Sequence, residues 1–184
     1  MNAWWSYFLP AFCAGLVFGV IAGSGALRVK IVRPKDRPAE PDLVHQPRQR
    51  RVVFIVAGAA LSIVAAAVWH GPLGAADRFS SAIERSARQV LVYNDAPNGI
   101  NVHVHHAPLT RQLILSGPGD DFQRAEAARL LELIPGVSKA TWTRHAGIPL
   151  IVQGAIAAVL GFLLGLLLAY LVELRRRYNA QWNW

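Results

Sequence analysis

One stretch of 25 residues, Ile148 to Val172, constrains this chain most, because it has no charged side chain and only one strongly polar residue, Gln153. A helix rises about 1.5 Å per residue, so the stretch can cross a hydrocarbon core of roughly 30 Å. Lipid offers the backbone no hydrogen-bond partners, and a helix satisfies its peptide groups internally. The sequence therefore predicts a transmembrane helix over residues 148–174.

Two further apolar runs, residues 3–27 and 52–69, predict two more transmembrane helices. A cleaved signal peptide is the alternative for the first run, but such a peptide begins with basic residues. Here the first basic residue, Arg28, follows the run. Only 16% of the 184 residues are charged, against about a quarter in soluble domains. We therefore expect a membrane protein that retains all three helices.

The distribution of charge predicts the topology. The net charge is +8, and residues 28–51 hold 8 Lys or Arg against 3 Asp or Glu. Because this basic excess lies beside apolar spans, it favours a topology signal over nucleic-acid binding. Residues 28–51, rich in proline, are expected to form an extended cytoplasmic linker, and residues 175–184 a basic and aromatic cytoplasmic tail. The N-terminus and residues 70–147 then lie in the periplasm, with the spans in a bacterial inner membrane. The opposite orientation would leave both cationic segments outside.

Small residues recur on one face of each predicted span, at the spacing that lets helices approach closely. These predicted packing residues are Gly15, Gly19, Gly23, Gly58, Ser62, Gly154, Ala158, Gly161 and Gly165. Tryptophans near the ends of the spans and of the chain are predicted to anchor it at the membrane interfaces. They are Trp4, Trp5, Trp69, Trp182 and Trp184.

Residues 70–147 are long enough to fold as a small extramembrane domain. A helical stripe is formed by Ala76, Phe79, Ile83, Ala87 and Val90. Alternating apolar residues predict a strand at 100–105, a second strand follows at 109–115, and a third is expected at 137–143. Between the last two, Asp120 and Gln123 resemble a capping box that begins a helix with an apolar face. That face is expected to contain Phe122, Ala125, Ala128 and Leu131. The order helix–strand–strand–helix–strand predicts an α+β sandwich with its helices on one face of a sheet.

Three segments of this domain resemble the BON-domain family over roughly residues 77–143. They are Leu113–Gly117, the Arg- and Ala-rich segment 123–129, and Ile134–Ala140. Gly117 and Gly136 match the family's glycines and are expected to form turns. Where the family usually has a polar loop with glycine between its first two strands, this chain has His106-Ala107-Pro108. The resemblance implies a bacterial envelope module that binds phospholipid or other proteins and has no catalytic residues.

Few residues suggest chemistry. His103 and His105 share a strand face and, with His145, are weak candidates for a metal site, whereas an exposed polar strand face is the simpler interpretation. His70 at a span end is a weak candidate ligand for a haem or chlorophyll metal, with an interfacial polar residue as the alternative. No phosphate-binding or hydrolase motif is present. We therefore predict no enzyme activity, no cofactor and no small-molecule substrate.

The sequence favours a non-catalytic accessory or assembly subunit of a larger inner-membrane complex. It is expected to dock through its small-residue helix faces and its BON-like domain, with membrane lipids and other subunits as partners. The alternative is a phospholipid-binding protein that maintains the envelope.

Overall fold

The structure is a computed structural model that describes residues 3–28, 42–96, 99–143 and 147–180, with residues 42–48 described as backbone only. The described residues form five helices and a three-stranded sheet. They divide into two compact units, one of residues 1–9 with 68–154 and the other of residues 10–67 with 155–184. Each unit is described by itself below.

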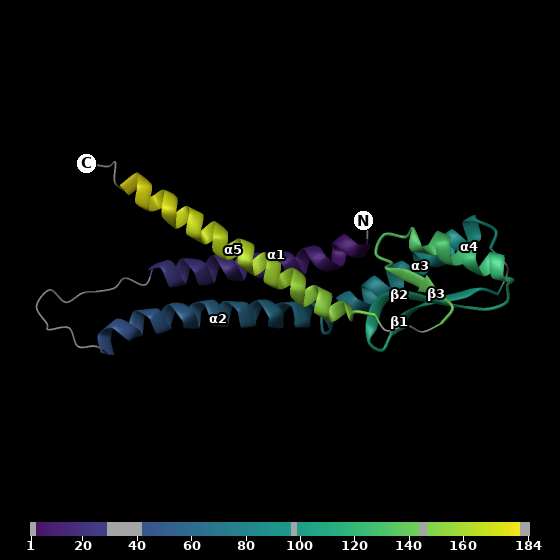
Figure 1. The fold of residues 1–184 in the computed structure, drawn as a ribbon, viewed down its shortest axis with the longest axis horizontal. Helices are drawn as coiled ribbons and strands as arrows, with labels where there is room; N and C mark the ends of the chain where they lie inside the picture. The colour runs from purple at the N-terminus through teal and green to yellow at the C-terminus, as the bar shows by residue number, and fades with distance from the viewer. Residues whose placement is uncertain (1–2, 29–41, 97–98, 144–146, 181–184) are drawn as a thin grey trace, which may run out of the picture. The chain divides into compact units, whose positions relative to one another are not determined.

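The second unit consists of parts of three long helices, α1 (Ala3–Arg28), α2 (Asp42–His70) and α5 (Leu150–Ala180). All three contain a stretch that is long and apolar enough to span a membrane, which in α2 is Gln49–His70. Within this unit α5 crosses α1, and α2 runs beside α1 (Figure 1). In length and composition the three helices are those expected of a membrane protein.

The prediction of an extended linker as far as Arg51 was wrong at its C-terminal end, because helix α2 already begins at Asp42. Three prolines of this segment precede the helix, at positions 34, 38 and 41, and the fourth, Pro47, lies within it. A proline inside a helix removes one backbone hydrogen bond, and this loss did not end the helix here. At the other end of the chain, α5 continues past the predicted span to Ala180. Arg177 there donates to Glu173 one turn earlier, at 3.0 Å.

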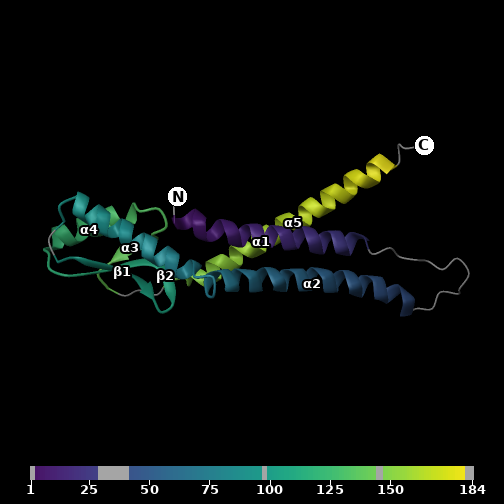
Figure 2. The same ribbon diagram turned by 180° about the vertical axis from the view of Figure 1, so that it is seen from behind.

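The first unit contains the α/β domain, whose elements follow the predicted order helix–strand–strand–helix–strand. They are α3 (Ala75–Tyr93), β1 (Asn101–His106), β2 (Leu109–Ser116), α4 (Asp121–Glu132) and β3 (Lys139–Thr141). The central strand β2 pairs antiparallel with β1 and parallel with β3. Helix α4 makes the crossover that a parallel pair requires. Both helices lie on the same side of the sheet (Figure 2).

The core of the domain lies between these helices and the sheet. It includes Val102 and Val104 of β1, Leu113 and Leu115 of β2, and Ala140 of β3. In α3 the predicted stripe is buried at Phe79, Ile83 and Ala87, but Ala75 and Leu91 are buried in place of Ala76 and Val90. In α4 the predicted face was right for Leu131, which is buried, and for Ala128, which is partly buried against the core. It was wrong for Ala125 and Phe122, which are exposed, and Ala127 is buried instead.

The turns and caps of the domain follow from local chemistry. Asp120 and Gln123 form a reciprocal capping box at the start of α4, with the Asp120 carboxylate accepting from the Gln123 backbone at 2.7 Å. Gly117 and Gly136 adopt φ values of 134° and 111°, which favour glycine. A Cβ at Gly117 would also collide with the carbonyl oxygen of Gly99. These positions fix the ends of β2 and the approach to β3.

Candidate functional site

The domain is built directly on the ends of the long helices, because residues 1–9 and 68–70 belong to its own compact unit. Tyr7 of α1 is only 2% exposed and is part of the domain's core cluster. Its hydroxyl shares a hydrogen bond of 2.6 Å with Nδ1 of His70, at the end of α2. Trp69 donates from Nε1 to the Tyr7 carbonyl at 3.0 Å, and the Tyr7 ring packs edge-on against Phe79 of α3. One tyrosine therefore joins α1, α2 and α3.

The start of α5 meets the same tyrosine. Leu150 is completely buried, and its carbonyl accepts from the Tyr7 hydroxyl at 3.4 Å. Gly154, one turn further, leaves room for the ring, since a Cβ there would lie 3.1 Å from the Tyr7 oxygen. We call this group the Tyr7 junction: Tyr7, Trp69, His70, Leu150 and Gly154. It brings the ends of three candidate membrane-spanning helices into the core of the domain.

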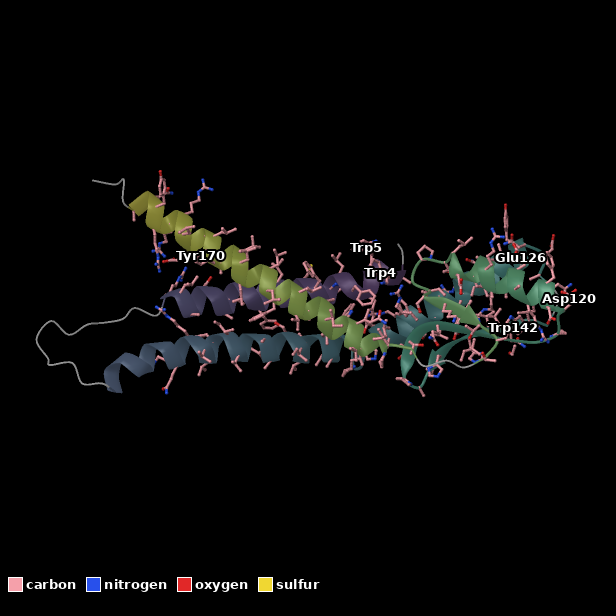
Figure 3. The ribbon with its side chains drawn as sticks, viewed as in Figure 1. Trp4, Trp5, Asp120, Glu126, Trp142 and Tyr170 are labelled. Atoms are coloured by element: carbon pink, nitrogen blue, oxygen red, sulfur yellow. The ribbon has the colours of Figure 1, made fainter. Side chains whose placement is uncertain are left out.

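Arg111 of β2 makes a second connection between the sheet and the helix ends. Its Nε donates to the Gly136 carbonyl at 2.8 Å, and its Nη1 donates to the side-chain oxygen of Gln153 in α5 at 3.4 Å. Its guanidinium lies 5.8 Å from the ring centroid of Trp4. Figure 3 labels Trp4 near the start of α1. Burial lowers the pKa of Arg111 from its ordinary value. The hydrogen bonds and the aromatic face compensate this loss of hydration.

These contacts give several predicted site residues a structural role. Nδ1 of His70 is engaged by Tyr7, so this nitrogen is not free to ligate a metal. Trp4 and Trp69 take part in the contacts between the helix ends and the domain, whereas Trp5 is 54% exposed. Trp182 and Trp184 lie outside the described residues. The junction itself was not predicted, because Tyr7 is more than 60 residues away in the sequence from each of its partners there.

The strand histidines do not converge on one point. His103 is exposed on β1. His105 donates from Nδ1 to the Pro108 carbonyl at 2.8 Å. His106 lies 3.4 Å from Glu84, whose carboxylate also accepts from the backbone of Val104. No group of three metal-ligating side chains occurs within the part of the chain that the structure describes, and His145 lies outside that part. His105 and His106 therefore make local contacts at the β1 edge, and His103 lies on its exposed face.

The small-residue faces of the spans contact one another inside the chain. A Cβ at Gly15 or Gly19 would meet the carbonyl oxygens of Ala158 and Phe162. From the other side, a Cβ at Gly161 or Gly165 would meet those of Phe12 and Leu16.

The remaining predicted packing residues lie on the same internal faces. A Cβ at Gly23 would lie 2.7 Å from the Ala169 methyl, and one at Gly58 would lie 2.6 Å from the Ala22 methyl. Ser62 is fully buried and donates back to the Gly58 carbonyl at 2.8 Å. Because these faces are already filled by the chain's own helices, they do not offer the docking surface that the sequence suggested.

An exposed surface on the second half of α3 is the better candidate. We call it the α3 patch, and it comprises Arg85, Arg88, Gln89, Val92 and Tyr93, which line a hollow of about 440 Å³. Val92 is 79% exposed and Tyr93 is 88% exposed, which is high for large apolar side chains. Among the described residues neither arginine has an ion-pair partner.

A larger groove of about 540 Å³ continues from this patch toward the end of α4. It is lined by Ser86, Gln89, Val90, Tyr93, Asn94, Leu130, Leu133, Ile134 and Pro135. The two hollows share Gln89 and Tyr93. An apolar surface bordered by cations is suited to a partner segment with apolar and acidic side chains.

Comparison of the chain with models of protein families, with curated proteins and with solved structures found no match.

Proposed function

We propose that this chain is a non-catalytic accessory or assembly subunit of a larger bacterial inner-membrane complex. The observation that carries the proposal is the α3 patch on the domain that is seated on the helix ends. It is an apolar surface with two arginines that have no ion-pair partner among the residues that the structure describes. A domain that shares its core with the helix ends stays beside the membrane surface. Such a domain is suited to holding a neighbouring subunit rather than to reaching a distant target.

The orientation and the domain type belong to the same proposal. The cationic segments 28–51 and 175–177 favour a cytoplasmic location for both, which assigns the domain to the periplasm. In the predicted topology the N-terminus and the domain lie on the same side of the membrane. The grouping of residues 1–9 with 68–154 in one compact unit supports this topology. The order of the five domain elements supports the BON-like assignment. Membrane lipids surround the spans, whose outward side chains are mostly apolar.

The partner segment that fits the α3 patch is apolar and acidic. Val92 and Tyr93 provide apolar contact area, and Arg85 and Arg88 beside them favour carboxylates. Aromatic and arginine side chains often dominate the binding energy of protein interfaces. A second subunit with an acidic juxtamembrane segment is therefore the partner we propose for this surface.

The experiment is a pull-down of the tagged full chain from native membranes in a mild detergent, with quantitative mass spectrometry. Wild-type protein is expected to bring down another membrane protein at a fixed molar ratio. Arg88→Glu is expected to lower that ratio at least fivefold, whereas the matched reversal Lys139→Glu, at another exposed cation, leaves it unchanged. Recovery of the chain with lipid alone would contradict the proposal and favour the phospholipid-binding alternative.

A further inference from the structure

Helix α4 carries an exposed stripe that does not contribute to the domain core. It consists of Phe122, Glu126, Arg129 and Leu133, at spacings of four, three and four residues, which lie along one helix face. Phe122 is 78% exposed and Leu133 is 75% exposed. Leu133 caps the helix in the helical conformation, so the stripe extends over the whole of α4. Figure 3 shows Glu126 on this helix, away from the junction with α1.

Along the helix the four side chains of the stripe are apolar, acidic, basic and apolar. Their positions are symmetric about the midpoint between Ala127 and Ala128, so each apolar residue has an apolar counterpart and the acidic residue has the basic one. If a second α4 lies antiparallel against the first around a two-fold axis, Phe122 faces Leu133 of the other copy. In the same register Glu126 faces Arg129 of the other copy, and each contact occurs twice.

We propose that the α4 stripe is a homodimer interface, in which two copies of this chain pair their α4 helices antiparallel. The spacing of four and three residues is that of a coiled-coil seam, with apolar contacts at the ends and ion pairs at the centre. Within one chain Glu126 and Arg129 lie 3.6 Å apart, and both side chains remain exposed at this face, 43% for Glu126 and 78% for Arg129. The charge complementarity selects a second copy as the occupant. Leu133 also lines the groove that continues from the α3 patch, whereas none of the five residues of the α3 patch belongs to the stripe.

Cysteine cross-linking tests the register directly. In a Cys13→Ala background, the full chain carrying Phe122→Cys is mixed in membranes with the full chain carrying Leu133→Cys, and the mixture is mildly oxidised. The antiparallel register predicts a disulfide between the two variants. Eleven residues of helix span about 16 Å, so Phe122→Cys alone and Leu133→Cys alone are expected to cross-link at least tenfold less. Stronger cross-linking within either single variant would overturn the register, and absence of any cross-link would overturn the interface.

A charge-exchange experiment separates pairing from folding. Glu126→Arg alone and Arg129→Glu alone place like charges opposite each other in a homodimer, and each is expected to lower the dimer fraction. Co-expressed with different tags, the two variants bring opposite charges together in both central contacts. They are therefore expected to form mixed dimers at least fivefold above the level of either homodimer, although each chain still lacks its internal pair. Equal amounts of mixed and homodimers, or adducts with lipid only, would contradict the proposal.

Discussion

At the scale of single residues, Tyr7 of α1 contacts three elements that are distant from it in the sequence, namely α2, α3 and α5. Its ring is in the domain core, its hydroxyl reaches α2 and α5, and its carbonyl accepts from Trp69. Nothing about a tyrosine near the start of an apolar run distinguishes it from an interfacial anchor. Its role follows only from the fold, because the partners come from three separate segments.

We predict that Tyr7→Phe destabilises the full chain by about 1–3 kcal/mol, because it leaves Nδ1 of His70 without its buried partner. Thermal unfolding in a mild detergent measures the change. The control Tyr93→Phe also removes a tyrosine hydroxyl, but from a side chain that is 88% exposed. It is expected to leave the midpoint of thermal unfolding unchanged. A loss of equal size in both variants would show that the hydrogen bond at the junction is not responsible.

Arg111 makes a second residue-scale prediction. A lysine keeps the charge but does not reproduce the fork that reaches both the Gly136 carbonyl and Gln153. We expect Arg111→Lys to cost about 1–3 kcal/mol of unfolding free energy in the same assay. The exposed control Arg85→Lys should unfold with the wild type. An Arg111→Lys protein as stable as the wild type would mean that charge alone is needed at this position.

At the scale of elements, the helical spans and the order of the domain elements were predictable, because both depend on local patterns. Apolar length predicted the three long helices that are candidate spans, and the capping box at Asp120 marked the start of α4. The buried face of α4 was not predictable from periodicity, since Leu131 is compatible both with a face through Phe122 and with one through Ala127. Packing against α3 and β3 selects between them.

Sequence patterns also identified the small-residue faces without showing what they contact. Small residues at this spacing are expected both where helices pack within one chain and where helices of different chains pack. Only the fold shows that α1 and α5 fill each other's faces. The candidate docking surface then moves to the α3 patch, whose arginines and Tyr93 appear in the sequence as an ordinary polar helix end.

The crossing of α1 and α5 gives the element-scale prediction. A methyl group at Gly161 would collide with the carbonyl oxygen of Phe12, so Gly161→Ala must push the helices apart. We expect a destabilisation of about 1–3 kcal/mol and faster digestion of the detergent-solubilised protein by trypsin. Ala60→Val, on an exposed position of α2, adds more volume and should leave both readouts unchanged. If Gly161→Ala, like Ala60→Val, left the stability and the rate of digestion unchanged, the close crossing of α1 and α5 would be contradicted.

At the scale of the whole molecule, the boundary of the compact domain does not coincide with the ends of the apolar helices. Tyr7 and Leu150 complete the domain core from within the long helices. We predict that an excised fragment of residues 72–146 exposes Phe79 and its neighbours, binds a hydrophobic dye and lacks a cooperative unfolding transition. The full chain in detergent is the reference. A fragment that unfolds cooperatively without binding dye would show that the helix ends are dispensable.

The most direct test of the proposed function is the mass of the particle that contains this chain, extracted from native membranes with its lipids and measured by light scattering. The chain itself has a mass of 20.1 kDa. An accessory subunit is expected in a particle several times heavier than two chains, with another membrane protein in fixed ratio. A particle of two chains and lipid would contradict that function while leaving the α4 pairing intact, and a single chain with lipid would contradict both.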